Sequence, residues 1–456
     1  MSIDPGTMGT AERASRLIAY TASEVFAEGA FAGRKYIVVD GEVIAAIVDV
    51  APPSASVVDF REAAIYPSAV NTHTHSFQSL LRGCVDGIDL GQWLERVYAS
   101  SADYGPEECY LGAALSFGEM LRSGTTAVAD FFYLNARGNE NVHAVIRAAT
   151  DIGIRLVMGR AGLDAEWGGR GAMETIPQVV ERFRSLAGDY KGHPLVEISP
   201  APHSIYGASR AMIEAMYQLA VDHDTLWYIH VADPSSPEES SLNRPGQRTI
   251  PMLESWGVLD HRLVLAHALF LKDEEVALVA RRGARISCNP ASGMWFGDGI
   301  LDIPRLWKRG IKVGLATDGA ASNNALNLFR EAWLASLGQK LRARDPGAVT
   351  AAQIAGLVTE DGGRVLNLPV GRLAPKWKAD FVVLDVLDFT LQPLSALASN
   401  IVQAMSERAV RHVYCAGRQV VKDGQLTQID QKELLRRAAR LLAGNESETG
   451  PHRRAG

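Results

Sequence analysis

The stretch Asn71-Thr72-His73-Thr74-His75 places two histidines one residue apart at the end of a largely apolar run that covers residues 63–70. The run is typical of a β-strand, in which residues i and i+2 point to the same side. His73 and His75 are therefore expected to project together from the end of a strand, where two neutral imidazoles can bind one divalent cation. Chance pairs of this kind occur in many chains. Whether this pair indicates a metal site therefore depends on the residues that follow the other strands.

Apolar runs that alternate with helix-like segments follow this stretch. We predict eight strands, at residues 65–71, 125–131, 154–159, 195–200, 226–230, 263–267, 284–288 and 312–317. Their near-continuous apolar character is typical of parallel strands that are buried on both faces. Eight strand–helix units in this order predict a (β/α)8 TIM barrel.

The two ends of the chain have a different β-character. Residues 15–20, 36–39 and 43–48 are predicted short strands, with a hairpin turn at Asp40-Gly41. Strand-like runs return after about residue 372. We therefore predict an α/β protein in which a catalytic barrel of residues 65–370 is inserted into a small β-sandwich domain. That domain would be built from residues 1–64 and residues 371–456, and the second part would end in a helix and a tail.

The composition limits the class of protein. The chain has 456 residues, 47% of them hydrophobic, and its 46 basic and 52 acidic residues are well mixed, with a formal net charge of −6. A protein that binds nucleic acid or an anionic membrane would instead have a basic patch. No apolar run reaches the ~18 residues of a membrane-spanning helix, and no secretory signal is visible. The four cysteines include no Cys-x-x-Cys pair, so we expect a cytoplasmic protein with reduced thiols.

Metal-compatible side chains recur at the ends of the other predicted strands. His203 follows the fourth strand, His230 ends the fifth, His267 ends the sixth and Asp318 follows the eighth. Active sites of (β/α)8 barrels lie at these C-terminal strand ends, so these residues and the first histidine pair are expected to meet. Histidines with one carboxylate suit zinc or ferrous iron and leave room for a water molecule. The fourth strand carries Glu197 and no lysine that could bridge two ions, which favours a single metal.

The chain resembles the amidohydrolase superfamily over nearly its whole length, and in particular its chlorohydrolase and aminohydrolase branch. The segments that carry the resemblance are Asn71-Thr72-His73-Thr74-His75 with Phe77-Gln78-Ser79-Leu80-Leu81-Arg82-Gly83, Gly124-Thr125-Thr126 with Asp130, Leu265-Ala266-His267, Thr317-Asp318-Gly319-Ala320-Ala321-Ser322-Asn323-Asn324, Val370-Gly371-Arg372-Leu373-Ala374-Pro375, Lys378-Ala379-Asp380 and Ala416-Gly417-Arg418. That branch includes deaminases of cytosine, guanine, 8-oxoguanine, S-adenosylhomocysteine and pterins, as well as triazine chlorohydrolases. The resemblance implies that the metal ligands are His73, His75, His230 and Asp318.

The segment after the fifth strand departs from the pattern of this branch. Related deaminases usually carry a glutamate three residues after the strand-five histidine, and it moves protons to the substrate ring and the leaving group. Here that position is Asp233, which is one methylene shorter. Proton transfer requires a reach of ~2.6–3.2 Å, so either Asp233 serves a differently placed substrate or the shuttle is lost and the reaction differs. A second departure lies at residues 287–292, which read Ser-Cys-Asn-Pro-Ala-Ser where relatives often have Cys-Pro-x-Ser-Asn.

The leading hypothesis is a metal-dependent hydrolase that deaminates an amino-substituted N-heteroaromatic ring: a purine, pteridine, pyrimidine or triazine. One ion, zinc in preference to iron, would make hydroxide available near neutral pH. Asp318 is the candidate to take the proton of the water, Asp233 to protonate a ring nitrogen, and His267 to hydrogen-bond the attacking oxygen. The alternatives are hydrolysis of an aryl chloride, thioether, amide or urea in the same site, and a binding protein that has lost turnover through the change at Asp233.

Candidate substrate contacts lie just beyond the metal-bearing strand ends. Gln78 and His203 are candidates to contact the polar edge of the substrate, and Trp93, with Trp295 and Phe296, is a candidate for an aromatic wall. Each has a plainer interpretation: Gln78 on a helix surface, His203 as a helix cap, and Trp93 in packing. The expected partner is a small heterocyclic substrate, with neither nucleic acid nor a membrane. A homodimer or a larger homo-oligomer is expected because relatives often form one.

Overall fold

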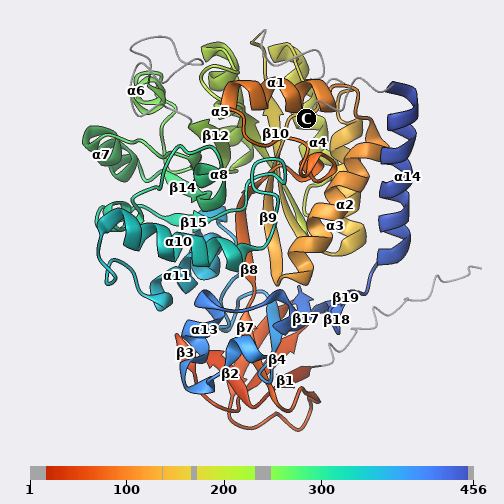
Figure 1. Cartoon of the computed structure of the whole chain (residues 1–456), viewed down its shortest axis with the longest axis vertical. Helices are drawn as coiled ribbons and strands as arrows, with labels where there is room; N and C mark the ends of the chain where they lie inside the picture. Colours follow the sequence, from red (N-terminus) through yellow and green to blue (C-terminus); the bar gives the residue numbers. More distant parts are fainter. Residues whose placement is uncertain (1–16, 136, 166–171, 232–247, 450–456) are drawn as a thin grey trace, which may run out of the picture.

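The computed structural model describes residues 17–135, 137–165, 172–231 and 248–449, with the backbone alone for residues 444–449. Figure 1 places the strands from both chain ends together at one end of the molecule, in red and blue. Strands that alternate with helices occupy the rest of the view. The chain therefore begins in the strands near its N-terminus and continues through the part in which strands alternate with helices, called the alternating part below. It then returns to the strands near its C-terminus, which share the terminal sheets with the first ones.

Two four-stranded parallel sheets form the centre of the alternating part. The first has the order β11-β10-β9-β8, and the second has the order β12-β13-β14-β15. All neighbouring strands within each sheet run parallel. The strands are β8 (Ala69–Thr74), β9 (Thr125–Phe132), β10 (Arg155–Gly162), β11 (Val196–Pro202), β12 (Trp227–Val231), β13 (Leu263–His267), β14 (Arg285–Cys288) and β15 (Val313–Leu315). The predicted alternation of parallel strands with helices is confirmed.

Hydrogen bonds connect the two parallel sheets on both sides. After β11, the carbonyl of His203 accepts from the amide of His230 in β12, at 3.0 Å. On the other side, the amide of Asp318 donates to the carbonyl of His73 in β8, at 3.1 Å. Asn71 also donates from its side chain to the hydroxyl of Thr317, at 2.8 Å. The ends of β8, β11, β12 and β15 are therefore held next to one another.

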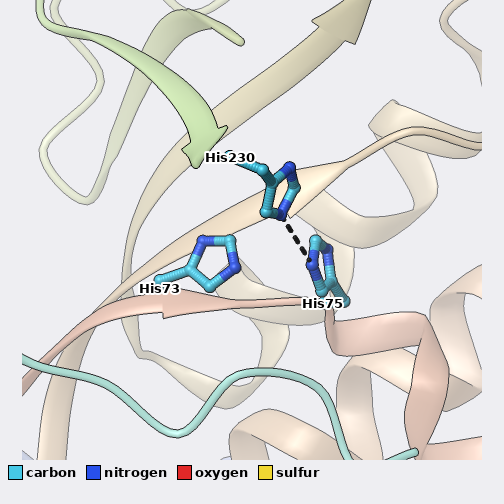
Figure 2. Close-up of side chains that lie close together, drawn as sticks. All are labelled: His73, His75 and His230. Carbon is cyan, nitrogen blue, oxygen red and sulfur yellow. Dashed lines mark hydrogen bonds between the residues drawn. The ribbon is translucent and has the colours of Figure 1, made fainter. Parts of the chain in front are cut away.

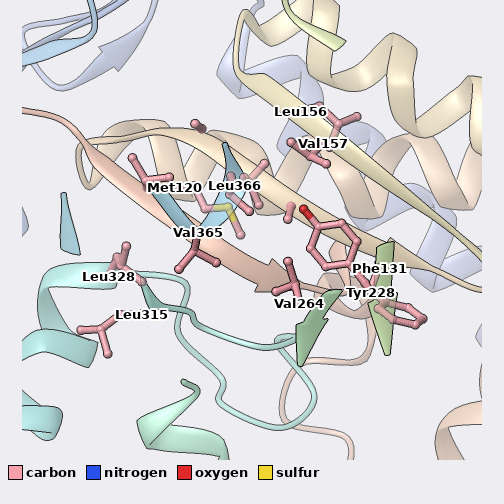
Figure 3. Close-up of a cluster of buried hydrophobic side chains, with 14 of the residues drawn as sticks. Met120, Phe131, Leu156, Val157, Tyr228, Val264, Leu315, Leu328, Val365 and Leu366 are labelled. Carbon is pink, nitrogen blue, oxygen red and sulfur yellow. The ribbon is translucent and has the colours of Figure 1, made fainter. Parts of the chain in front are cut away.

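Helices follow the strands and bury a common apolar core with them. Figure 3 shows side chains from several strands and helices meeting in this core, among them Met120, Phe131, Tyr228, Val264 and Leu315. The helices of this part are α1 (Leu90–Ser101), α2 (Pro106–Arg122), α3 (Glu140–Ile152), α4 (Ile176–Asp189), α5 (Arg210–His223), α6 (Thr249–Ser255), α7 (Asp273–Arg282), α8 (Pro290–Trp295), α9 (Ile303–Trp307), α10 (Leu328–Ala343), α11 (Ala351–Val358) and α12 (Glu360–Leu366). The strands are thus buried on both faces, as their apolar sequences predicted.

The first predicted strand, residues 65–71, is wrong in its limits because it covers two strands. β7 (Ala63–Pro67) pairs with strands of the chain ends, whereas β8 begins at Ala69 and pairs with β9. Pro67 has no N–H to continue a hydrogen-bonded ladder. Ser68 bridges the two sheets, because its hydroxyl contacts that of Thr126 at 2.6 Å. An apolar run therefore continues through a point where the chain changes sheets.

Two sheets built from the chain ends pack around a second apolar core. The four-stranded sheet has the order β5-β4-β1-β6 and contains β1 (Ile18–Thr21), β4 (Tyr36–Asp40), β5 (Val43–Val48) and β6 (Ser56–Asp59). The seven-stranded sheet has the order β19-β18-β17-β16-β7-β2-β3 and adds β2 (Glu24–Ala27), β3 (Ala30–Phe31), β16 (Phe381–Asp385), β17 (Val410–Cys415), β18 (Arg418–Lys422) and β19 (Gln425–Leu426). Tyr20 and Ile37 from the first sheet share this core with Ile65 and Phe381 from the second. The predicted hairpin at Asp40-Gly41 joins β4 to β5.

The helices near the C-terminus have separate positions. α13 (Leu397–Gln403) lies beside α10, where Gln403 donates to the hydroxyl of Ser336 at 3.1 Å. α14 (Gln431–Thr449) leaves the terminal sheets and lies along α2, as Figure 1 shows. Arg437 of α14 pairs with Glu107 of α2 at 2.7 Å. The last helix of the chain therefore covers a helix of the alternating part.

Two further features bear on the class of protein. None of the helices among the described residues is long and apolar enough to cross a membrane. All four cysteines are free thiols, with Cys84 exposed and the others buried. The fold therefore does not use disulfide bonds for its stability.

A pair of glycine variants tests the packing of α12 on β8. A Cβ at Gly362 would lie 2.8 Å from the carbonyl oxygen of Val70 and 2.9 Å from its Cβ, so Gly362→Ala forces α12 away from β8. We expect this variant to lower the free energy of unfolding by about 1–3 kcal/mol, and the thermal midpoint with it. Gly188→Ala in α4 is the control, because nothing lies within 4 Å of its added Cβ and alanine favours the helix. Equal midpoints for the two variants would contradict this packing.

Candidate metal centre

Three histidine side chains converge at the C-terminal ends of two parallel strands. His73 lies in β8, His75 follows that strand directly, and His230 lies in β12. All three are buried, and their ligand nitrogens lie within 4.8 Å of one another. Figure 2 shows the three rings pointing toward a common centre, with the Nε2 atoms of His75 and His230 3.2 Å apart.

The hydrogen bonds of the Nδ1 atoms fix which ring nitrogens face this centre. His75 donates from Nδ1 to the carbonyl of Phe131 at 2.6 Å. His230 donates from Nδ1 to the carbonyl of His203 at 2.9 Å. In a neutral imidazole the second nitrogen then carries a lone pair. Both rings therefore present an unprotonated Nε2 to the same point, which is the arrangement of metal-binding histidines.

The protonation state of the three rings fits a cation between them. Burial lowers the pKa of His73, His75 and His230, so the rings are neutral near pH 7. Two lone pairs that face each other at 3.2 Å repel unless a cation lies between them. The Nε2 atom of His73 is buried and has no hydrogen-bond partner among the residues that the structure describes. The donor set of these residues therefore fits a divalent metal ion.

Asp318 adds a carboxylate to the three histidines. Its Oδ1 atom lies 3.6 Å from the Nε2 atoms of both His73 and His75. The amide of Gly319 donates to Oδ1 at 2.8 Å, and the hydroxyl of Ser292 donates to Oδ2 at 2.7 Å. Burial alone would raise the pKa of Asp318, but the surrounding imidazoles and the Ser292 hydroxyl lower it overall, so the carboxylate is ionised.

His267 is partly exposed and faces the carboxylate of Asp318. It ends β13, and its Nε2 atom is 4.0 Å from Oδ2 of Asp318. The side-chain amide of Asn289 donates to Nδ1 of His267 at 3.2 Å, which places the proton of a neutral ring on Nε2. His267 and Asp318 both have left-handed backbones, with φ of 69° and 58°. Such strain in residues other than glycine is typical of functional sites.

A buried carboxyl group supports the turn that carries His75. Asp130, in β9, accepts from the backbone amide of Ser76 at 2.9 Å and also from its hydroxyl. The hydroxyl of Ser116 in α2 donates to the carbonyl of Ser76 at 2.7 Å. Burial raises the pKa of Asp130 to about 7, against the hydrogen bonds from Ser76. The segment just after His75 is therefore held from both β9 and α2.

Two predicted substrate contacts, Gln78 and His203, lie beside the histidines with a pair of tyrosines. Gln78 is buried in the 3-10 helix η1 (Ser76–Leu81) and donates to the hydroxyl of Tyr133 at 3.2 Å. The Nε2 atom of His203 hydrogen-bonds the hydroxyl of Tyr98 at 3.1 Å, and burial lowers the pKa of His203 to about 3. The rings of Tyr98 and Tyr133 stack with centroids 5.1 Å apart, and the Tyr133 ring contacts His75 edge-on. These four side chains form a polar aromatic wall next to the metal ligands.

Trp93 joins three segments near the site. Its indole N–H donates to the carbonyl of Ala321, in the segment that follows Asp318, at 3.0 Å. The ring of Phe296 packs against it edge-on at 5.6 Å, so these two predicted aromatic residues do lie together. Trp295 is partly exposed. The polar group of Trp93 is thus already used by the fold.

Most of the predicted site residues lie close together, and one lies outside the residues that the structure describes. The structure brings together His73, His75, His230, His267 and Asp318, with His203 against His230 and Gln78 bonded to Tyr133, which contacts His75. Asp233 lies outside the described residues. The contacts of Asn289 and Ser292 were not predicted, although both residues follow β14 and the strand-end rule applies to them. Tyr98 and Tyr133 were not predicted either, and Tyr98 reaches the site from α1, for which the sequence contains no comparable signal.

Comparison with known proteins identifies the family. The model of the amidohydrolase family matches residues 64–420. The chain therefore belongs to the amidohydrolase family. The resemblance found in the sequence is confirmed, and so is the expectation of an aminohydrolase, because the curated relatives are deaminases.

Individual relatives cover nearly the whole chain. A 5′-deoxyadenosine deaminase from Methanothermobacter thermautotrophicus is 32% identical and covers 94% of this chain and 99% of its own length. A 5-methylthioadenosine/S-adenosylhomocysteine deaminase from Nitratidesulfovibrio vulgaris is 32% identical, over 87% of this chain and 90% of that protein. The zinc-bound structure of an adenosine deaminase from Xanthomonas campestris has a TM-score of 0.85 at 26% identity, over 94% of this chain and 98% of its own. The zinc complex of atrazine chlorohydrolase from Arthrobacter aurescens has a TM-score of 0.87, over 93% of this chain and 100% of that one, and at 24% identity it supports a likeness of fold alone.

Zinc addition after treatment with a chelator tests the metal centre. A ligand at 100 times its Kd stabilises the folded state by about 2.7 kcal/mol, so zinc should raise the thermal midpoint of the chelated protein. His73→Ala should remove most of this rise because it removes a buried ligand nitrogen. His143→Ala changes a partly exposed histidine of α3; it is the control and should keep the rise in full. An equal rise of the thermal midpoint in the wild type and both variants would show that zinc binds elsewhere.

Proposed function

We propose that this chain deaminates adenosine derivatives whose 5′-hydroxyl group is absent or replaced, releasing ammonia and leaving a 6-oxopurine. Hydrolytic chemistry is supported by one observation above all: the imidazoles of His73, His75 and His230 form one buried cluster, and the carboxylate of Asp318 lies 3.6 Å from the first two. The relatives support the substrate class, because one is named for 5′-deoxyadenosine and another for 5-methylthioadenosine and S-adenosylhomocysteine. These names share an adenine nucleoside without a free 5′-hydroxyl group.

The proposed architecture is a closed TIM barrel with a β-sandwich domain. The hydrogen bonds from β11 to β12 and from β15 to β8 support a barrel of eight strands, β8–β15. We assign residues 65–370 to the catalytic barrel domain and residues 1–64 and 371–456 to the sandwich domain. The position of β7 supports a small adjustment, with the boundary between β7 and β8. The strand ends of the barrel then carry the proposed metal ligands.

We assign the metal site to His73, His75, His230 and Asp318, and we propose one zinc ion, with iron as the alternative. Three nitrogen ligands and one oxygen ligand are a set that zinc accepts while an open position remains for water. Such an ion, when bound, lowers the pKa of water to about 7.

The side chains around the metal site have distinct proposed roles. Asp318 accepts the proton of the attacking water, since its carboxylate is ionised and held by Ser292 and Gly319. His267 donates a hydrogen bond from Nε2 to the attacking oxygen, because Asn289 places the ring proton there. General acid and base groups of this kind typically contribute about 10²–10⁴-fold to the rate each.

The wall beside the metal ligands is the proposed place for the polar edge of the purine. His203 stays neutral at pH 7 and can therefore contact the ring without adding a charge. Gln78 carries an Oε1 atom that is buried and has no hydrogen-bond partner among the described residues, so it can accept from a substrate N–H group. We propose Trp93 as an aromatic contact of the purine, with its indole N–H already engaged by Ala321.

The assembly and location of the protein are also proposals. Exposed apolar side chains at Trp333, Leu337 and Leu341 follow one another at four-residue intervals along α10 and support a homodimer or larger homo-oligomer. The free cysteines support a cytoplasmic location. The mixed charge of the sequence, with a formal net charge of −6, supports a small-molecule substrate rather than nucleic acid or a membrane as the partner.

Ammonia release from a substrate panel tests the proposed function. The zinc-loaded protein is assayed with 5′-deoxyadenosine, 5-methylthioadenosine, S-adenosylhomocysteine and adenosine, and each product is analysed by mass spectrometry. We expect ammonia, a product one mass unit heavier, and higher kcat/KM for the nucleosides without a 5′-hydroxyl. Chloride release from chlorotriazines, together with no ammonia from any nucleoside, would assign the chain to the alternative chemistry.

Substitution of Asp233 tests the proposed proton shuttle to the ring nitrogen. Asp233→Asn should lower kcat by about 10²–10⁴-fold, because an amide cannot deliver the proton. Its zinc content should stay at the wild-type level, since Asp233 is not a proposed ligand. Asp233→Glu, which restores the usual family residue, should keep measurable turnover, and Asp345→Asn on the surface is the control. Wild-type kcat in Asp233→Asn would show that another group protonates the ring.

A further inference from the structure

A buried carboxyl group outside the candidate site connects the two segments that follow β14 and β15. Glu331, on α10, is fully buried. Its Oε2 atom accepts from the backbone amide of Ala291 at 2.8 Å, and its Oε1 atom accepts from the side-chain amide of Asn323 at 2.9 Å. Burial raises the pKa of Glu331 to about 8. Burial of a carboxyl group is costly, so a sequence keeps one where its hydrogen bonds hold something in place.

Each of the two hydrogen bonds acts next to Asp318. Ala291 immediately precedes Ser292, whose hydroxyl donates to Oδ2 of Asp318 at 2.7 Å. Asn323 donates from the same side-chain nitrogen to the carbonyl of Thr317, the residue before Asp318, at 2.7 Å. Glu331 therefore holds the donor of the Ser292–Asp318 hydrogen bond with one oxygen. With the other oxygen it holds the segment that contains the acceptor.

The amide of Ala291 needs an acceptor from outside its own helix, whereas the segment of Asp318 is also held by the hydrogen bond from the Asp318 amide to the carbonyl of His73. α8 begins at Pro290 and has only six residues, so the amide of Ala291 has no partner within its own helix. Asp318 has a left-handed backbone with φ of 58°, which the surrounding structure must impose. Glu331 supplies a fixed acceptor to the segment of Ala291, and through Asn323 it holds the segment that contains Asp318.

We propose that Glu331 is a positioning residue of the metal centre: it keeps the Ser292 hydroxyl on Oδ2 of Asp318, so that Oδ1 faces His73 and His75. Nothing in this arrangement requires Glu331 to contact the substrate or the metal ion. The inference rests on the proposed function only in that Asp318 is taken as a metal ligand and proton acceptor.

A double-mutant cycle of Glu331→Gln and Ser292→Ala tests this proposal. Glutamine has nearly the same shape as glutamate, but it offers one acceptor oxygen and turns an N–H group toward a donor. The main measurement is zinc affinity by competition with a chelator, which does not depend on knowing the substrate. We expect each single variant to bind zinc about 10- to 100-fold more weakly, as for other residues that orient a ligand. The double variant should be no weaker than the weaker single variant, because both changes act on the same carboxylate.

Kinetics and stability complete the test. With a substrate in hand, kcat should fall about 10- to 100-fold in both single variants while KM changes by less than about 3-fold. The control is Asp380→Asn, a fully buried carboxylate that accepts from the amide of Ala416 at 2.6 Å in the terminal sheets. It should lower the thermal midpoint and leave zinc affinity unchanged.

The results that overturn the proposal are specific. Unchanged zinc affinity in Glu331→Gln with a lowered midpoint would show that Glu331 serves stability alone. Losses that multiply in the double variant would show that Glu331 and Ser292 act independently. If Glu331→Gln does not fold, Asn323→Ala removes one of the two contacts and takes its place in the same cycle. A failure to deaminate any nucleoside would contradict the proposed function and would leave the zinc measurement to decide this inference.

Discussion

The rest of the site depends on one close approach: the unprotonated Nε2 atoms of His75 and His230 are held 3.2 Å apart. The rings cannot turn away, because Nδ1 of His75 is bonded to the carbonyl of Phe131 in β9 and Nδ1 of His230 to the carbonyl of His203 after β11. The backbone of four strands thus sets the direction of two side chains. A small change in the register of any of these strands would move a lone pair off the common centre. The precision of the site is therefore a property of the sheets rather than of flexible loops.

Three buried carboxyl groups around the centre are in different electrostatic situations. Asp318 faces imidazoles and a hydroxyl donor, and these keep its pKa low in spite of burial. Asp130 and Glu331 accept hydrogen bonds from neutral donors alone, and burial raises their pKa to about 7 and about 8. The same side-chain chemistry thus gives an ionised ligand at the centre and carboxyl groups that titrate near neutral pH around it. Partners, rather than residue type, set the charge at each position.

The sequence was sufficient for the parts that follow from local rules. The alternation of a strand explains why His73 and His75 point together, and the strand-end rule explains why His230, His267 and Asp318 join them. The same rule applied to the seventh strand would have included Asn289 and Ser292. Tyr98 could not be found in this way, because it reaches His203 from a helix whose position depends on the whole fold. The split between β7 and β8 was also hidden, since apolar residues continue on both sides of Pro67 and Ser68. Trp93 shows a further limit, because its indole N–H is engaged by Ala321, a contact between distant parts of the chain.

β7 lies between β2 and β16 in the seven-stranded sheet, so it needs a partner from each end of the chain. On the ribosome, β7 and all eight strands of the alternating part are made before β16 emerges. One edge of β7 must therefore stay unpaired while most of the protein is already outside the exit tunnel. Unpaired strand edges are sites of aggregation, and contacts between distant segments form slowly. The seven-stranded sheet can therefore be completed only after the last strands have been synthesised. A chain that stops early exposes an unpaired strand edge beside an otherwise folded catalytic part.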